Sequence, residues 1–122
     1  MNLHRRNIST DNTKFILVVD DEYDLVNLIK QSLQMNRRKV SGFADPIMAL
    51  EHFKVNHKNC GLIISDIRMP RMNGYELVKK AKEIDKQIKV ILMSAFEINE
   101  REFHNVLPDI KVDAFLQKPF QV

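Results

Sequence analysis

The chain has 122 residues, of which 44% are hydrophobic and 29% are charged, and its formal net charge is +3 at pH 7. These values are typical of one globular domain with a single core. The lone cysteine excludes an internal disulfide framework, and no apolar stretch approaches the ~20 residues of a membrane span. The basic residues are scattered in short groups, so we expect no direct binding of nucleic acid. Because no membrane span is predicted, we expect a cytoplasmic protein that does not bind membranes.

The chain begins with a segment that predicts neither a strand nor a helix. Residues 1–13 lack the apolar region of a signal peptide, and we expect them to form a disordered tail before a domain over residues 14–122. The domain opens with the apolar run 15–19, which predicts a buried strand. This run ends in Asp20 and Asp21, an acidic pair that could cap a helix or belong to a site.

A helix and a short strand follow the first run. Leucine and isoleucine recur at helical spacing as far as Asn36, and residues 39–43 predict a second strand. Asp45 and Pro46 then predict the start of another helix, because Asp is a good N-cap residue and Pro is favoured at the first helical position.

The third predicted strand carries the most informative residue of the chain. Residues 62–65 complete an apolar run that ends in Asp66. A carboxylate in such a place is costly to bury unless it has a partner or a function. Asn73 and Glu76 then resemble a capping box at the start of the next helix.

The last part of the chain adds two strands and a short helix. Strand 90–93 ends in Ser94, a helix stopped at Pro108 follows, and strand 113–116 leads to Lys118. Strands that alternate with helices indicate an α/β fold with a doubly wound parallel sheet.

A fifth helix is missing from this pattern. Residues 119–122 are all that follow Lys118, which is too few for a helix. We expect one side of the sheet to be under-covered. Either the chain is truncated before the fifth helix, or another subunit or a helix of a longer parent protein fills the gap, and the uncovered face is a candidate surface for homodimerisation or other self-association.

Polar residues at the ends of four predicted strands carry the chemical groups that one reaction requires. Each of them alone could be a helix cap or a surface residue. Because open α/β sheets bind ligands at the carboxyl ends of their strands, together they favour phosphoryl transfer to a carboxylate. These residues are Asp20, Asp21, Asp66, Ser94 and Lys118.

The three carboxylates predict a metal ion. Two carboxylates ~4 Å apart repel each other by about 4 kcal/mol at an effective dielectric constant of 20. A divalent cation relieves this repulsion, and an all-oxygen site with room for phosphate oxygens suits Mg²⁺. An aspartate can then act as the nucleophile, while a lysine and a serine hydroxyl bind the transferred group.

The same residues lie in motifs that resemble those of the receiver domain of two-component response regulators. The resemblance covers residues 14–120. It implies a flavodoxin-like, five-stranded parallel sheet in the order 2-1-3-4-5. The motifs are Val18-Val-Asp-Asp-Glu22, Asp66-Ile-Arg-Met-Pro70 with Gly74, Ser94-Ala95 and Lys118-Pro119-Phe120.

The resemblance also implies a role for each site residue. Asp66 is the phosphoacceptor, and Ser94 and Lys118 bind the phosphoryl group. The implied Mg²⁺ ligands are three carboxylates and one backbone carbonyl, those of Asp20, Asp21, Asp66 and Arg68.

A conformational switch follows from the same resemblance. Ser94 moves toward the phosphoryl group, and Phe115, at the family's aromatic switch position, turns inward. Phe115 could instead be a core residue in one or both states.

Arg68 and Phe96 lie where side chains can gate the access of water, and because both are large we expect slow self-dephosphorylation. Arg68 could alternatively pair with a nearby carboxylate.

The implied function is that of a phospho-accepting switch. A histidine kinase or phosphotransfer protein donates the phosphoryl group to Asp66, and the changed surface controls a partner or an output. The domain catalyses its own phosphorylation and dephosphorylation, with no expected turnover of an external substrate. The main alternative is a receiver-like docking module that works without phosphorylation. A haloacid-dehalogenase-type phosphatase and a flavodoxin are disfavoured, because the first strand is followed by neither a D-x-D motif nor a phosphate-binding loop.

Overall fold

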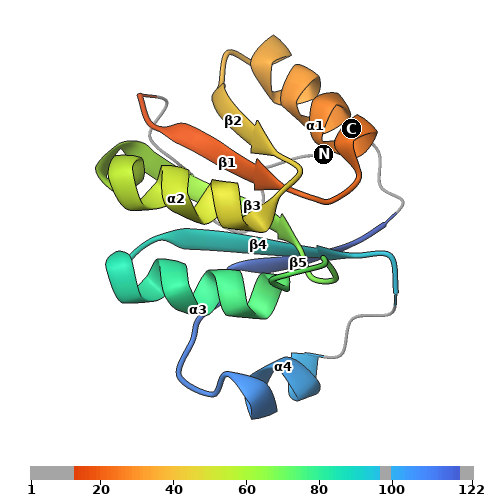
Figure 1. Cartoon of the computed structure of the whole chain (residues 1–122), viewed down its shortest axis with the longest axis vertical. Coiled ribbons are helices and arrows are strands. Elements are labelled where there is room, and N and C mark those ends of the chain that lie inside the picture. The colour runs from red at the N-terminus through yellow and green to blue at the C-terminus, as the bar shows by residue number, and fades with distance from the viewer. Residues whose placement is uncertain (1–12, 97–99, 119–122) are drawn as a thin grey trace.

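Five parallel strands form one sheet in the order β2-β1-β3-β4-β5. The computed structural model describes residues 13–96 and 100–118 (Figure 1). The predicted doubly wound α/β fold and its strand order are confirmed. The predicted tail falls, apart from Thr13, outside the described residues and stays a prediction. The elements are β1 (Phe15–Val19), α1 (Tyr23–Met35), β2 (Lys39–Phe43), α2 (Pro46–Asn56), a short 3-10 helix η2 (His57–Asn59), β3 (Cys60–Asp66), α3 (Gly74–Ile84), β4 (Lys89–Ser94), α4 (Glu100–Val106) and β5 (Ala114–Gln117).

The starts of α2 and α3 follow from their local sequence. Oδ1 of Asp45 accepts a hydrogen bond from the backbone N–H of Ile47 at 2.9 Å and so caps α2. Asn73 and Glu76 form the predicted capping box of α3, in which each side chain accepts from the backbone of the other residue. Both helix starts are therefore determined by residues next to them in the chain.

The end of α1 is a Schellman motif built on an arginine. Arg37 has a φ angle of 61°, and its N–H donates to the carbonyl of Gln34 at 2.9 Å. The next N–H, of Arg38, donates to the carbonyl of Leu33 at 3.1 Å. These two bonds define the motif, and they explain the left-handed conformation of Arg37.

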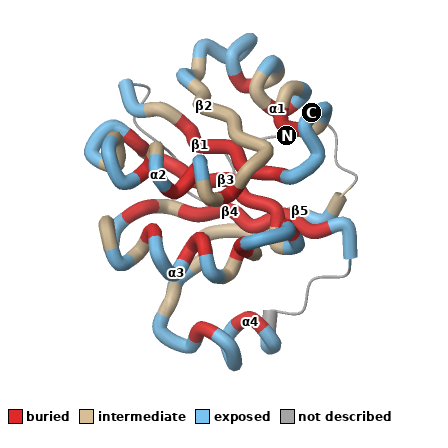
Figure 2. The backbone as a smooth tube through the Cα atoms, viewed as in Figure 1, coloured by how far each residue is buried: buried red, intermediate tan, exposed pale blue. Residues whose placement is uncertain are grey.

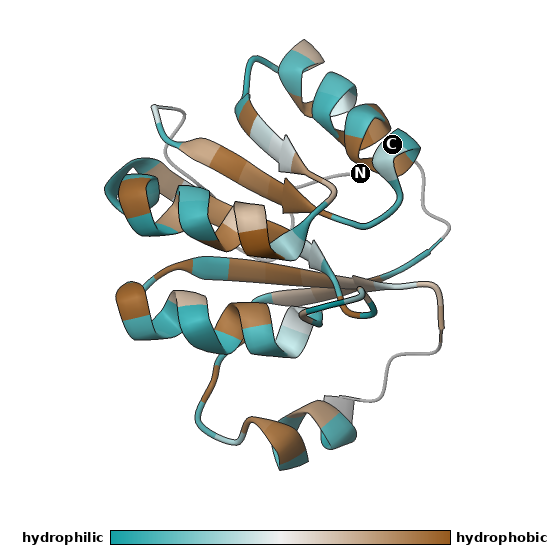
Figure 3. Ribbon diagram, viewed as in Figure 1, coloured by the Kyte–Doolittle hydropathy of each residue, from teal (hydrophilic) through white to brown (hydrophobic). Residues whose placement is uncertain are grey.

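Helices cover both faces of the sheet. α2, α3 and α4 pack on one face and α1 on the other (Figure 1). Neighbouring strand residues alternate between the layers: Leu17 and Ile63 face α2 and α3, whereas Ile16 and Ile64 face the α1 side. The three central strands β1, β3 and β4 are therefore buried along most of their length (Figure 2), and their apolar runs are continuous (Figure 3). The edge strands β2 and β5 are half-buried. No helix among the described residues is long and apolar enough to cross a membrane.

The α1 face is the one predicted to be under-covered. Within the part of the chain that the structure describes, which ends at Lys118, α1 is the one helix on this face. Ile64 and Met93 on this face are nevertheless fully buried, whereas Ala114 and Leu116 in β5 are only half-buried. Incomplete cover on this face therefore lies at the two edge strands of the sheet, at Val40 of β2 and at Ala114 and Leu116 of β5.

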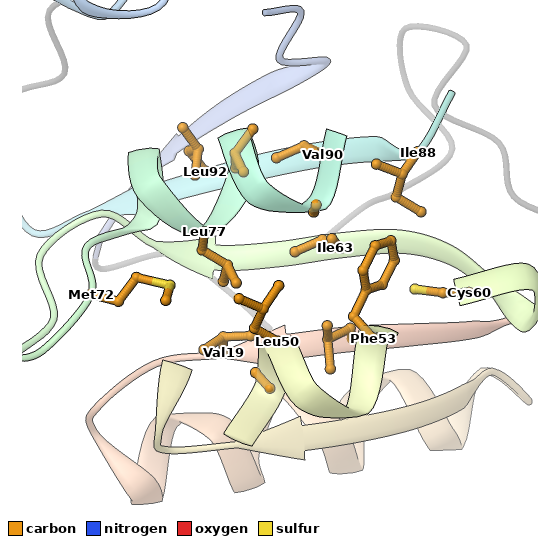
Figure 4. Close-up of a cluster of buried hydrophobic side chains, with 14 of the residues drawn as sticks. Val19, Leu50, Phe53, Cys60, Ile63, Met72, Leu77, Ile88, Val90 and Leu92 are labelled. Carbon is orange, nitrogen blue, oxygen red and sulfur yellow. The ribbon is translucent and has the colours of Figure 1, made fainter. Parts of the chain in front are cut away.

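The larger core lies between the sheet and the layer formed by α2 and α3 (Figure 4). Phe53 of α2 is fully buried in it, in the same cluster as Ile63 of β3 and Leu77 of α3. Cys60 is buried beside this cluster, and burial raises the pKa of its thiol to about 11. Cys60 is therefore a packing residue and not a reactive thiol at neutral pH.

Replacing Phe53 tests how much this core contributes to stability. We expect Phe53→Ala to lower the free energy of unfolding by about 3–5 kcal/mol, because the lost ring leaves a cavity in a packed core. The measurement is urea denaturation followed by circular dichroism. Val55→Ala is the matched control, since Val55 lies in the same helix with 81% of its surface exposed, and its effect should stay within about 0.5 kcal/mol. Equal effects of the two substitutions would contradict this account of the core.

Candidate functional site

The carboxyl ends of four strands meet at one edge of the sheet. Asp20 follows β1, Asp66 ends β3, Ser94 ends β4, and Lys118 lies directly after β5. β4 and β5 end together because Ser94 pairs in register with Gln117. The parallel topology therefore brings to one place residues that are far apart in the sequence.

Lys118 is the residue that links these strand ends. Its Nζ lies 2.6 Å from Oδ2 of Asp20 and 3.4 Å from Oδ1 of Asp66, and it also contacts the exposed Glu22 at 3.5 Å. The side chain of Lys118 is only 10% exposed, and Asp20 and Asp66 are buried as well. Water therefore screens these charges poorly, and their attraction and repulsion act at close to full strength.

Asp20 is fully buried but incompletely hydrogen-bonded. Its Oδ1 accepts a hydrogen bond from the backbone N–H of Glu22 at 2.9 Å. Its Oδ2 makes the short contact with Nζ of Lys118, but this contact lacks the alignment of a hydrogen bond. Charge attraction is then what compensates this oxygen for the loss of water. A buried carboxylate oxygen that is short of donors is well placed to bind a cation.

Burial and crowding shift the ionisation of the cluster. The pKa of Asp66 is raised to about 6, first by burial and then by the charge of Asp20, although Lys118 opposes the shift. Burial likewise raises the pKa of Asp20 against the effect of the same lysine. Burial acts to lower the pKa of Lys118, but its contacts with Asp20 and Asp66 outweigh burial and raise it. The cluster thus carries more negative charge than one lysine offsets.

Asp21 completes the group of carboxylates from the solvent side. One oxygen from each of Asp20, Asp21 and Asp66 lies within 4.8 Å of the others, and Asp21 is exposed. The group offers hard oxygen ligands and leaves an open side for water or phosphate oxygens, a combination that suits Mg²⁺. Together with the under-satisfied Oδ2 of Asp20, this donor set fits the predicted metal ion.

The segment between β3 and α3 turns tightly beside Asp66. The N–H of Ile67 donates to the carbonyl of Met93 at 2.9 Å, and the N–H of Gly74 donates to the carbonyl of Ile67 at 2.8 Å. A Cβ atom at Gly74 would collide with the backbone carbonyl of Asp66, so the close approach requires glycine. Arg68, whose carbonyl is a predicted metal ligand, lies within this closed turn.

Ser94 is buried at the end of β4, and its hydroxyl is engaged within its own loop. Its Oγ accepts a hydrogen bond from the N–H of Phe96 at 3.1 Å. Its carbonyl accepts from the backbone N–H of Lys118 at 2.7 Å, which joins the ends of β4 and β5. Because Ser94 accepts in this bond, its hydroxyl proton remains available to donate to a phosphoryl oxygen.

Arg68 and Phe96 meet on the solvent side of the site. Cζ of Arg68 lies 4.5 Å from the centroid of the Phe96 ring, the geometry of a cation–π contact. Both residues are exposed, so the contact bridges the segments that follow β3 and β4. The sequence predicts both as gating residues, but it does not predict that they touch each other.

Phe115, the predicted switch residue, packs against the core. Its ring lies 5.5 Å from that of Phe103 in α4, and the Phe103 ring lies 5.4 Å from that of Tyr75 in α3. Phe115 is half-buried and Phe103 is fully buried. This placement agrees with the core interpretation of Phe115, and its role as a switch stays a prediction.

Glu22 is a site residue that sequence reasoning misses. It is the N-cap residue of α1 but makes no hydrogen bond as a side-chain cap, and its carboxylate instead contacts Lys118. The signal that could have identified it is its place in the acidic run over residues 20–22, directly after a buried strand.

Comparisons with known proteins agree with this geometry. Residues 16–122 match the family model described as response regulator receiver domain. The response regulator receiver protein CpdR of Brucella abortus is 30% identical over 110 residues, which cover 89% of this chain and 88% of CpdR. The putative two-component response regulator ARR21 of Arabidopsis thaliana is 33% identical over 87 residues, 71% of this chain, but the chain spans only 14% of ARR21.

Solved structures show the same arrangement of elements. The response regulator protein TrrA of Thermotoga maritima, in complex with Mg(2+)-BeF, superposes with a TM-score of 0.74 at 30% identity. The match covers 88% of this chain and 89% of that chain. Since the family match spans most of the sequence and the sheet has the predicted strand order, the chain belongs to the response regulator receiver domain family.

Proposed function

We propose that this domain is a phospho-accepting signalling switch, in which Asp66 takes a phosphoryl group from a histidine kinase or phosphotransfer protein. The observation that carries this proposal is the contact of the buried Lys118 with Asp66, beside a group of carboxylates that fits Mg²⁺. Membership of the receiver family supports the same assignment.

Four groups would hold the metal ion: the carboxylates of Asp20, Asp21 and Asp66 and the backbone carbonyl of Arg68. Bound Mg²⁺ supplies positive charge that offsets the carboxylates and attracts phosphate oxygens. The TrrA structure, which contains Mg(2+)-BeF, supports the choice of this ion. Burial first, and then the charge of Asp20, raises the pKa of Asp66, and the crowding of three carboxylates is the physical reason for a cation here.

The transfer is a displacement at phosphorus. A carboxylate oxygen of Asp66 forms an O–P bond while the P–N bond to the donor histidine breaks, and the bonding electrons leave with the imidazole nitrogen, which takes up a proton. Lys118, whose Nζ lies 3.4 Å from Oδ1 of Asp66, donates to the transferred phosphoryl oxygens. Attack of water on the acyl phosphate later restores the carboxylate and releases phosphate.

The phosphoryl group biases the domain between two states. Ser94, whose Oγ accepts from the Phe96 N–H, moves to donate a hydrogen bond to the phosphoryl group, and Phe115 and its surroundings respond. Complete inversion from 1:99 to 99:1 requires about 5.5 kcal/mol of differential stabilisation. Two hydrogen bonds to a charged group, from Lys118 and Ser94, contribute about 1.5–3 kcal/mol each, so they supply much of that difference.

A receiver-like docking module that works without phosphorylation is the alternative. The half-buried Ala114 and Leu116 of β5 favour it, because incompletely covered apolar surface promotes association with a partner or with a second copy. Neither function includes turnover of an external phosphate ester.

Phosphorylation of Asp66 is the first test of the proposed function. Incubation with acetyl phosphate and Mg²⁺ should add one phosphoryl group, observed by intact-mass spectrometry, and chelation of the metal should prevent it. Asp66→Ala should show no adduct, whereas Asp24→Ala, at an exposed carboxylate in α1, should behave like the wild type. Lys118→Ala should slow the reaction by about 10²-fold, because the transferred charge loses its buried donor. A folded wild-type protein that forms no adduct would contradict the proposed phosphorylation and favour the docking module.

The pH dependence of stability tests the electrostatics of the cluster. Because the pKa of Asp66 in the folded protein, about 6, exceeds its usual value of 3.8, the folded state binds more protons than the unfolded state between these pH values. The wild type should therefore lose stability relative to Asp66→Asn as the pH rises from 4 to 7 without Mg²⁺, by on the order of 2 kcal/mol. Urea denaturation at both pH values in EDTA measures this difference. A difference independent of pH would show that Asp66 is not strained by its neighbours.

The lifetime of the phosphorylated state tests the gating residues. We expect a half-life of minutes or longer for phospho-Asp66, because Arg68 and Phe96 together cover the approach of water. Arg68→Ala and Phe96→Ala should each shorten it about two- to fivefold, the change that loss of an exposed cation–π contact implies. Decay of the mass adduct after removal of the donor gives the rate, with Arg101→Ala in α4 as control. A wild-type half-life of seconds would rule out such gating.

A further inference from the structure

Arg71 has a positive φ angle within the turn between β3 and α3. Its φ angle is 73°, and Arg37 is the one other non-glycine residue with positive φ among the described residues. The left-handed conformation is unfavourable for residues that have a Cβ atom. For Arg37 the Schellman motif at the end of α1 accounts for it. At Arg71 the N–H of Met72 donates to the carbonyl of Pro70 at 2.8 Å and closes a three-residue turn, a strained geometry that persists only where surrounding contacts hold it.

The side chain of Arg71 reaches a different helix. Its NH1 donates to Oδ2 of Asp45 at 2.7 Å, across 26 positions of sequence. Asp45 is at the same time the cap of α2, through its Oδ1. The two carboxylate oxygens of Asp45 therefore have separate partners, so one residue ties the start of α2 to the segment before α3.

The rest of the segment between β3 and α3 is held by core packing and by backbone hydrogen bonds. The side chains of Met69 and Met72 are buried in the core beneath α2 and α3, and the backbone of Ile67 is bonded on both sides. Arg71 lies between the two methionines with 61% of its side chain exposed, and its ion pair with Asp45 fixes the solvent side of the turn. Arg68, which carries the proposed carbonyl ligand, lies in the same turn.

We propose that Asp45 and Arg71 form a positioning clamp, which holds the turn between β3 and α3 in the conformation that presents the carbonyl of Arg68 to Mg²⁺. This inference rests on the proposed function, because it assigns the clamp to the metal site of the phosphorylation reaction. Neither residue touches the reacting atoms. Both act through the backbone of the turn.

Charge alone would give a different result from positioning, and the difference provides the test. Removing the negative charge of Asp45 weakens attraction for a cation near the site, whereas removing the positive charge of Arg71 strengthens it. A clamp predicts the same sign for both changes. Loss of either partner releases the turn and weakens Mg²⁺ binding.

The experiment measures Mg²⁺ affinity by isothermal titration calorimetry on the full chain. Asp45→Ser retains a good N-cap residue for α2 but removes the second oxygen, and Arg71→Gly permits the left-handed backbone but removes the ion pair. Each variant should weaken Mg²⁺ binding about two- to fivefold, the range expected for one exposed ion pair. The double variant should be no weaker than either single variant, because both substitutions break the same contact.

Arg37→Gly is the matched control. It makes the same backbone change and the same charge change at the other arginine with positive φ, which lies at the amino ends of the strands, away from the site. Its Mg²⁺ affinity should equal that of the wild type. Urea denaturation without Mg²⁺ verifies that every variant is folded. If Asp45→Ser is unfolded, Asp45→Asn, which keeps the cap oxygen, takes its place.

Three outcomes would overturn the clamp. Tighter Mg²⁺ binding by Arg71→Gly would show that charge alone acts, and unchanged affinity in both variants would show that the turn needs no clamp. Equal weakening by Arg37→Gly would show a nonspecific effect. If the wild type binds no Mg²⁺ and forms no phosphate adduct, the proposed function fails together with the clamp. If the wild type does both and the variants match it, the clamp alone fails.

Discussion

The site depends on one constraint of this fold, which holds buried carboxylates close enough to repel each other. Asp20 and Asp66 are fixed by neighbouring strands whose remaining residues build the core, so they cannot separate without disrupting the sheet. Lys118 contacts both of them and opposes the rise in their pKa, but burial first, and then the charge of Asp20, still raises the pKa of Asp66. The crowded carboxylates are the donor set that the proposed Mg²⁺ would need.

Fixed and exchangeable parts of the site are distributed over different segments. The end of β3 is fixed, because Gly74 packs against the backbone of Asp66 and closes the turn through Ile67. The segment after β4 is held by weaker contacts: the hydroxyl of Ser94 accepts one backbone N–H, and Phe96 stacks with Arg68 in solvent. A fixed Asp66 beside the loop that begins at Ser94 is an arrangement that suits the proposed two-state switch.

The sequence predicts those features that arise from neighbouring residues. The apolar runs that end in Asp20 and Asp66 identify the strands and their order in the chain, and Asp45 and Asn73 mark helix starts through local capping. The functional roles came from motifs, whose combination no local pattern explains. Contacts between residues that are far apart in the chain leave no local pattern in the sequence. The reach of Arg71 to Asp45, the contact of Glu22 with Lys118 and the burial of the α1 face all depend on side-chain packing between distant segments.

The position of Lys118 near the end of the domain also has a consequence for folding order. Its contact with Glu22 spans 96 positions, and such nonlocal contacts form late because a long loop must close first. A chain emerging from the ribosome exposes Asp20 and Asp66 before their counter-ion exists. Until β5 docks, pairing of β1 with β3 brings the two carboxylates together without the lysine that contacts them in the folded domain. The proposed site is therefore completed last, when β5 brings Lys118 into place.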